Sequence, residues 1–158
     1  MLSERGRLSS TAVGLCSNIV HGLGNNFRPL VPIIVPALVD LCRRPNKVVL
    51  TRAQACVMDV VCMSHCSDIL KHLRAAARDK SVQLRKACAE ATLKALQKWG
   101  IDEIGKRVED VEDIIRAIGR DPGPDVRKVA KEIYELYSTK WPERLREYVC
   151  HFATLLLR

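Results

Sequence analysis

The chain has 158 residues, with 26 Lys and Arg against 18 Asp and Glu, and its net charge of +8 indicates an acidic partner. The basic residues are spread along the sequence, which excludes a basic disordered arm, and no apolar stretch reaches the roughly 18 residues of a membrane span. Hydrophobic residues make up 47% but aromatic residues only 4%, so the composition favours closely packed helices and offers few stacking platforms for single-stranded nucleic acid.

Helical segments separated by short breaks are predicted along the whole chain. They cover residues 8–23, 27–43, 47–64, 67–78, 82–99, 101–118 with a break near Gly105, 125–138, and Pro142 to the end. The second segment should start late or be kinked, because its prolines (Pro29, Pro32 and Pro36) remove backbone donors. Ser67 is expected to cap the fourth helix at its N-terminus.

Two of the breaks share one motif, in which Asp is followed after four residues by an aliphatic residue and Arg. Residues 79–85 and 121–127 carry this motif, and they are offset by 42 positions (121 − 79). A period near 40 with paired helices is typical of HEAT repeats. We therefore predict an all-α HEAT-repeat solenoid of antiparallel helix pairs, the kind of array that usually offers an extended binding surface.

The predicted solenoid forms one domain, residues 1–158, with a half repeat at its start. The half repeat covers 1–25, helix pairs cover 26–65, 66–100 and 101–139, and a C-terminal helix covers 140–158. Because the first helix has no partner before it, we expect the sequence to be part of a longer array or a divergent gene product.

Successive turns within the helix pairs of a stacked solenoid fall along one edge, and much of the positive charge would lie there. This edge would carry Arg5, Arg7, Asn46, Lys47, Arg52, Lys80, Arg85, Arg127 and Lys128. Asp79 or Ser81, and Asp125, can cap the helices that follow the turns. Arg85 and Arg127 have two interpretations: an internal ladder with the Asp of their own or a neighbouring turn, or contacts to a partner.

Catalysis and metal binding find little support in the sequence. Most of the seven Cys lie in apolar helical runs, which is typical of buried, reduced thiols in a cytosolic or nuclear protein. Clustered Cys62, His65, Cys66 and His72 are interpreted as buried thiols and surface imidazoles, since they do not form the paired ligand sets of a zinc site. Cys150 and His151, as neighbours in a helix, point about 100° apart. We expect no catalytic residue, metal, cofactor or small-molecule substrate.

The order and spacing of several segments resemble the TOG domains of the CLASP family (cytoplasmic linker-associated proteins). The most specific of them is the turn Lys80-Ser81-Val82-Gln83-Leu84-Arg85 with Gln97-Lys98-Trp99 downstream. The resemblance runs over nearly the whole chain, through residues 23–27, 45–47, 79–88, 96–99, 121–127, 130–134 and 141–144.

The resemblance implies a paddle of about six HEAT repeats, of which this chain matches roughly the last four. It implies binding of tubulin or the microtubule lattice through the intra-repeat turns, stabilisation of microtubules, and a place in the cytoplasm on the cytoskeleton and spindle. The matching turn residues are Asn46, Lys47, Lys80, Ser81, Arg85 and Arg127.

Two other functions stay open. One is a HEAT scaffold with a non-tubulin partner, which would bind through its concave helix face. The other is a metal- or thiol-dependent activity. Nucleic acid is possible on charge alone, but no docking motif for it is present.

Overall fold

The computed structural model describes residues 4–145, and these residues are helical without any strand. The elements are α1 (Glu4–Leu23), the 3₁₀ segment η1 (Gly24–Leu30), α2 (Val31–Leu41), α3 (Lys47–Ser64), α4 (Ile69–Ala76), α5 (Val82–Lys98), α6 (Ile101–Gly105), α7 (Val108–Ile118) and α8 (Pro124–Lys140). The expected C-terminal helix 140–158, including Cys150 and His151, lies mostly outside the described residues.

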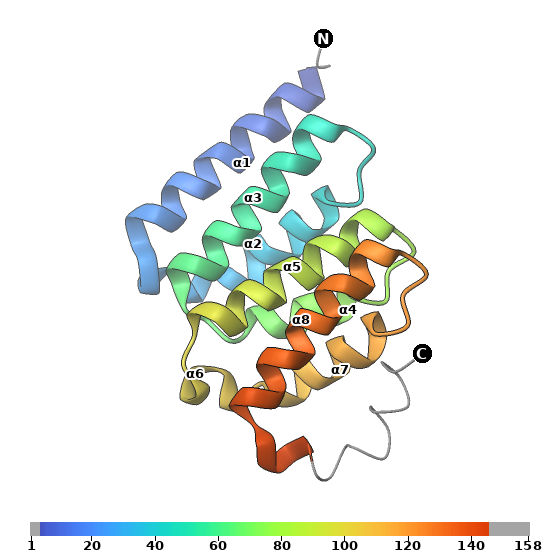
Figure 1. The fold of residues 1–158 in the computed structure, drawn as a ribbon. Helices are drawn as coiled ribbons and strands as arrows, with labels where there is room; N and C mark the ends of the chain where they lie inside the picture. The colour runs from blue at the N-terminus through green and yellow to red at the C-terminus, as the bar shows by residue number, and fades with distance from the viewer. Residues whose placement is uncertain (1–3, 146–158) are drawn as a thin grey trace.

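The helices form two layers (Figure 1). One layer holds α1, α3, α5 and α8 side by side, and the other holds α2, α4 and α7. Each helix of the first layer after α1 also packs against the helix that precedes it in the second layer, as α3 does against α2 and α5 against α4. The prediction of an all-α solenoid built from antiparallel helix pairs is therefore confirmed.

The prolines set where the second helix begins. Gly24 has φ +51°, a left-handed conformation that glycine adopts without steric cost, and it ends α1. The chain then forms η1, which contains Pro29, and α2 begins only at Val31 with Pro32 in its first turn. The predicted late start of this helix is confirmed.

Side-chain caps begin the helices that follow two of the turns. The Asn46 side-chain oxygen accepts hydrogen bonds from the backbone N–H groups of Val48 and Val49, at 3.1 and 3.3 Å. Ser81 Oγ accepts one from the N–H of Leu84 at 3.4 Å. Each cap satisfies donors that the first turn of a helix leaves unpaired, so these residues fix where α3 and α5 start.

Two expected caps are wrong. Asp68, not Ser67, is the N-cap of α4, and its side chain forms an ion pair with Arg107 in place of a capping bond. Asp125 lies inside α8, because Gly123 is the N-cap and Pro124 takes the first helical position. Proline has no N–H to satisfy there, so a side-chain cap is needed less.

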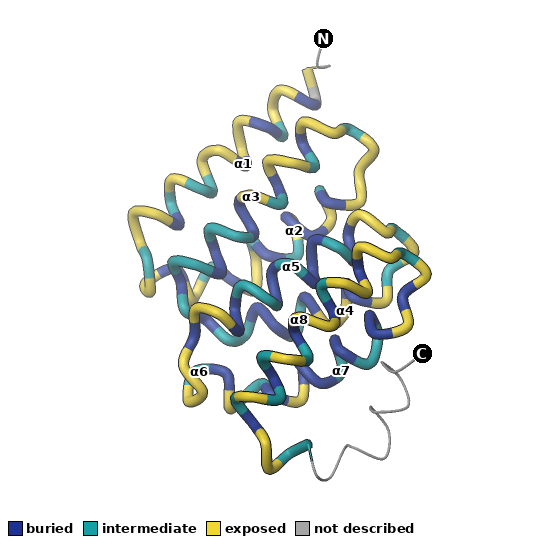
Figure 2. Tube along the Cα trace, viewed as in Figure 1, coloured by how far each residue is buried: buried dark blue, intermediate teal, exposed yellow. Residues whose placement is uncertain are grey.

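The core fills the space between the two layers, where Figure 2 shows the buried faces of the helices. It is mainly aliphatic, and its largest fully buried side chains include Trp99, Phe27, Ile69, Leu70, Leu73, Leu84, Leu96 and Ile114. Each such side chain contributes about 1.5–3 kcal/mol by leaving water. Because the core runs continuously from α1 to α8, it holds the turns of successive helix pairs in fixed positions.

Trp99 also joins three successive helices of the first layer at their C-terminal ends. Its buried indole N–H donates to the carbonyl of Val61 in the last turn of α3, at 2.9 Å. Its own carbonyl accepts from Lys140 Nζ at the end of α8, at 3.1 Å. Carbonyls in the last turn of a helix lack partners within the helix, so these bonds link one repeat to the next.

Candidate functional site

The turns inside the helix pairs lie along one edge of the molecule, at the right of Figure 1. They comprise residues 42–46, 77–81 and 119–123, each joining a helix of the second layer to one of the first. We call these turns, together with the first turn of the helix that follows each, the turn ridge. All six residues predicted as the site belong to it.

A ladder of Asp and Arg side chains connects the three turns. Arg43 Nε donates to Asp79 Oδ2 at 2.9 Å, from the first turn to the second. Arg85 donates two parallel hydrogen bonds to the carboxylate of Asp121, from the second turn to the third, with Nη2 and Oδ1 3.0 Å apart. We call these contacts the turn ladder, and they match the internal pairing considered for Arg85 from the sequence.

Arg85 is a structural member of the ladder. It is 8% exposed and Asp121 is 3% exposed. Its Nη1 also donates to the carbonyls of Asp79 and Lys80, at 2.8 and 3.0 Å. All of these acceptors belong to the chain itself, so the guanidinium positions the turns and has little surface to offer a partner.

Arg127 makes the same contacts to the carbonyls of its own turn as Arg85 does, but it lies at the surface. Its Nη1 donates to the carbonyls of Asp121 and Pro122. These positions correspond to Asp79 and Lys80 in the preceding turn. Because Arg127 is exposed, its guanidinium can close its own turn and face a partner at the same time.

Lys47 and Lys80 are the exposed ammonium groups of the first two turns. Within residues 4–145 neither forms an ion pair or a side-chain hydrogen bond that neutralises it. Their neighbours Asn46 and Ser81 are half-buried, and their side chains serve as the caps of α3 and α5. The six predicted residues thus divide into three surface cations, two caps and one ladder residue.

A groove of about 510 Å³ lies between the first two turns. We call it the ridge groove. Its walls are Arg43, Arg44, Pro45, Lys47, Leu50, Thr51, Gln54, Ser81 and Gln83. The groove brings Lys47 and Ser81 together from different helix pairs, and it adds Arg43 and Arg44, which the sequence reasoning missed.

A signal for Arg44 was present in the spacing of the caps. Asp79 stands two residues before the cap Ser81, and Arg85 four residues after it. Around the cap Asn46 the same two places hold Arg44 and Leu50. The first turn therefore replaces the acid of the motif with a base, which makes this part of the ridge more positive than the other turns.

The carboxylates of the ladder are held in their ionised form. The pKa of Asp79 is lowered, first by the hydrogen bond from the backbone N–H of Ser81, 2.8 Å away, and then by Arg43. Burial, the largest single influence, raises the pKa of Asp121, but the hydrogen bonds from Arg85 and the Gly123 N–H, together with the charges of Arg85 and Arg127, outweigh it and the pKa is lowered. Each ionised carboxylate neutralises one buried or bridging Arg, so the exposed cations determine the sign of the ridge.

Three buried thiols of the described region are held in their protonated form. Burial raises the pKa of Cys42 to about 11, and of Cys56 and Cys88 to about 12, so the reactive thiolate is disfavoured at neutral pH. Among residues 4–145 no three His, Cys, Asp or Glu side chains are grouped as metal ligands would be. No helix in this range is both long and apolar enough to cross a membrane.

Comparison of the sequence with known proteins identifies its family. Residues 1–154 match the family described as "CLASP N terminal". The chain is 24% identical over its whole length to "CLIP-associated protein" of Arabidopsis thaliana. It is 27% identical over 92% of its length to "Protein stu1" of Aspergillus fumigatus, and 26% identical over 89% to "Protein STU1" of Candida albicans. It spans 11% of the length of each of these relatives. The chain belongs to the CLASP N-terminal family.

Proposed function

We propose that the chain binds tubulin or the microtubule lattice through the turn ridge, and that it thereby stabilises microtubules or regulates their dynamics. The observation that carries the proposal is the position of three exposed cations, Lys47, Lys80 and Arg127, on successive turns of one edge. Membership of the CLASP N-terminal family, and the resemblance to TOG domains over nearly the whole chain, support the choice of partner.

The mechanism is electrostatic positioning without a catalytic step. The cations of the ridge face an acidic surface, which steers the encounter and fixes the orientation of the complex. Asp79 and Asp121, through the turn ladder, keep the spacing between the turns constant. An array of fixed spacing fits one tubulin curvature better than another, and a ligand that prefers one conformation shifts the population toward it.

This partner implies a location in the cytoplasm, on the microtubule cytoskeleton and the spindle. Substitutions in the turns distinguish this proposal from a scaffold that binds through a concave helix face, because they weaken only a partner bound at the ridge.

The test is co-sedimentation of the chain with microtubules at low and at raised salt. We expect the native chain to pellet with microtubules at low salt, and to be released as salt screens the exposed charges. The variant Lys47→Glu, Lys80→Glu should lose most of this binding, since two attractive contacts on the ridge become repulsive.

The matched control is Lys98→Glu, Lys131→Glu, which makes the same change of charge on exposed lysines away from the turns. It should keep most of the binding. Equal losses in both variants would mean that net charge alone drives the association, and undiminished binding of the ridge variant would refute the ridge as the tubulin site.

A further inference from the structure

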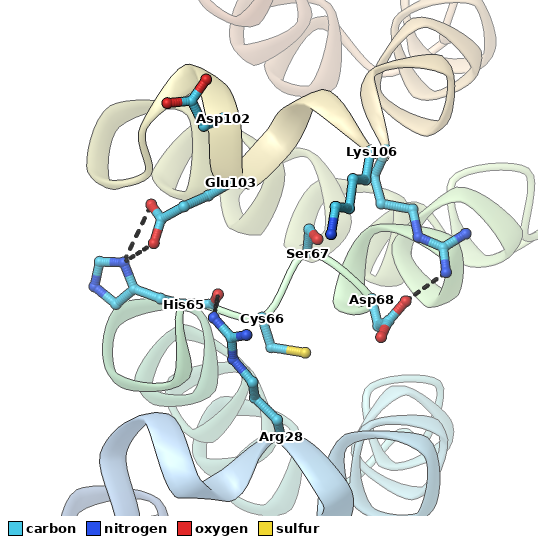
Figure 3. A pocket seen from close by; sticks show the side chains of 9 residues that line it. Arg28, His65, Cys66, Ser67, Asp68, Asp102, Glu103 and Lys106 are labelled. Atoms are coloured by element: carbon cyan, nitrogen blue, oxygen red, sulfur yellow. Dashed lines mark hydrogen bonds and ion pairs between the residues drawn. The ribbon is translucent and has the colours of Figure 1, made fainter.

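A second hollow, of about 400 Å³, lies at the edge opposite the turn ridge. It is formed by η1, the loop between α3 and α4, and α6 with the residues that follow it (Figure 3). We call it the opposite hollow. Its volume lies in the range of small ligand pockets, about 300–1,000 Å³.

The acidic side chains around the opposite hollow are either paired or turned away. Oε1 of Glu103 lies 3.2 Å from Nδ1 of His65, and Oε2 accepts a hydrogen bond from the backbone N–H of Gly100 at 2.8 Å. Asp68 forms an ion pair with Arg107. Figure 3 shows Asp102 directed away from the hollow. Asp68 is thus neutralised by a cation, and Glu103 is held at the wall by the His65 ring and the Gly100 N–H.

Two cations point into the hollow from opposite sides, Arg28 from η1 and Lys106 from the end of α6 (Figure 3). Arg28 Nη2 donates to the backbone carbonyl of His65 at 3.0 Å, an acceptor that orients the guanidinium without neutralising it. Lys106 is exposed, and its ammonium forms no ion pair with any residue of the range 4–145. The interior thus presents two positive charges that form no direct ion pair within residues 4–145.

His65 contacts both the cation Arg28 and the carboxylate of Glu103. It has φ 44° and ψ 39°, the one left-handed conformation of a non-glycine residue among those described. In this conformation its carbonyl holds Arg28, while its ring holds the carboxylate of Glu103 at the wall. A glycine would adopt the same backbone more easily but would leave Glu103 with the Gly100 N–H alone.

We infer that the opposite hollow is a docking site for the acidic side chains of a partner peptide, bound by Arg28 and Lys106. A carboxylate accepts the fork of donors that a guanidinium offers, and an ammonium on the facing wall can bind the next acidic side chain. The site is separate from the turn ridge and does not depend on the proposed function of the ridge.

The test uses a short fluorescein-labelled oligoglutamate peptide, titrated with the chain at low salt and followed by fluorescence anisotropy. The variant Arg28→Ala, Lys106→Ala should bind about tenfold more weakly, because it loses two charge-assisted contacts. The variant Lys98→Ala, Lys131→Ala removes the same charge from exposed lysines outside both the ridge and the hollow, and should bind within about twofold of the native chain. Equal weakening of both variants, or none in the first, would overturn the inference.

A second readout locates the peptide. In ¹⁵N–¹H correlation spectra, the peptide should shift the backbone amides of residues 65–67 and 106, and shifts confined to the ridge turns would contradict the site. All four substituted side chains are exposed, so both variants should keep the native melting temperature. Co-sedimentation with microtubules separates the two proposals, because the hollow variant should still pellet when the ridge variant does not.

Discussion

The turn ladder makes a quantitative prediction at its most buried rung. The substitution Arg85→Ala removes the guanidinium. With it are lost two hydrogen bonds to Asp121 and two to the carbonyls of Asp79 and Lys80. Asp121 keeps the backbone N–H of Gly123, at 2.8 Å, as its remaining hydrogen-bond donor among these contacts. The substitution therefore leaves a carboxylate that is buried and no longer neutralised.

The size of the effect follows from the burial of the pair. The Arg85 side chain is 10% exposed and that of Asp121 is 2% exposed, so solvent screens their interaction weakly. Removing one member of a buried ion pair costs about 3–5 kcal/mol, and the residual exposure of Arg85 favours the lower part, about 3–4 kcal/mol. A chain of this length loses about 2–4 °C of melting temperature per kcal/mol, so a decrease of about 10 °C is expected.

Urea unfolding followed by circular dichroism measures the loss in the free energy of unfolding. The control is Lys86→Ala, which removes a cation from the same helix whose Nζ meets Asp125 at 3.0 Å on the exposed surface. It should shift the midpoint too little to resolve, because exposed pairs contribute little. The double variant Arg85→Ala, Asp121→Ala should recover part of the loss, since no charge is then stranded. If Arg85→Ala were no more destabilising than Lys86→Ala, the ladder would not hold the turns.

Two further predictions concern stability. Since the folded-state pKa values of Asp79 and Asp121 are lowered, both carboxylates stabilise the fold above the unfolded value of about 3.9, and this contribution is lost as the pH falls through the lower folded values. The urea midpoint of the native chain should therefore decrease between about pH 6 and pH 2, and that of the variant Asp79→Asn, Asp121→Asn should decrease less steeply. An identical decrease of the midpoint with pH in both proteins would contradict the ladder. Trp99→Phe should cost roughly 2–4 kcal/mol by calorimetry, because it removes the bond to Val61 and leaves a void; a smaller loss would show that the indole N–H does not join α3 to α5.

The sequence predicted the helices where local chemistry decides their ends. Asn46 and Ser81 are caps with a strong intrinsic preference, and the prolines before Val31 exclude regular helix whatever packs around them. Ser67 was misjudged because the loop after α3 is determined by tertiary contacts. There Asp68 is drawn to Arg107, a residue 39 positions away, and no local pattern contains that pairing.

The site was predicted less completely, for a related reason. The sequence placed Lys47, Lys80 and Arg127 on turns, and the turns of a solenoid must align. It could not decide whether Arg85 faces inward, because that depends on Asp121 arriving from the next helix pair. The opposite hollow was also missed, since Arg28, His65 and Lys106 come from three separate elements and share no spacing signal.

The motif that organises the ridge also limits where the proposed binding can take place. At the second turn, where Asp79 and Arg85 occupy their usual places around the cap Ser81, both side chains are paired within the chain and offer little charge to a partner. The first turn departs from the motif, with Arg44 in the place of the acid and Leu50 in the place of the base. Arg43 then reaches across to Asp79, and Arg44 is left exposed at the ridge groove. Specificity for a partner should therefore be concentrated at the turn that breaks the repeat.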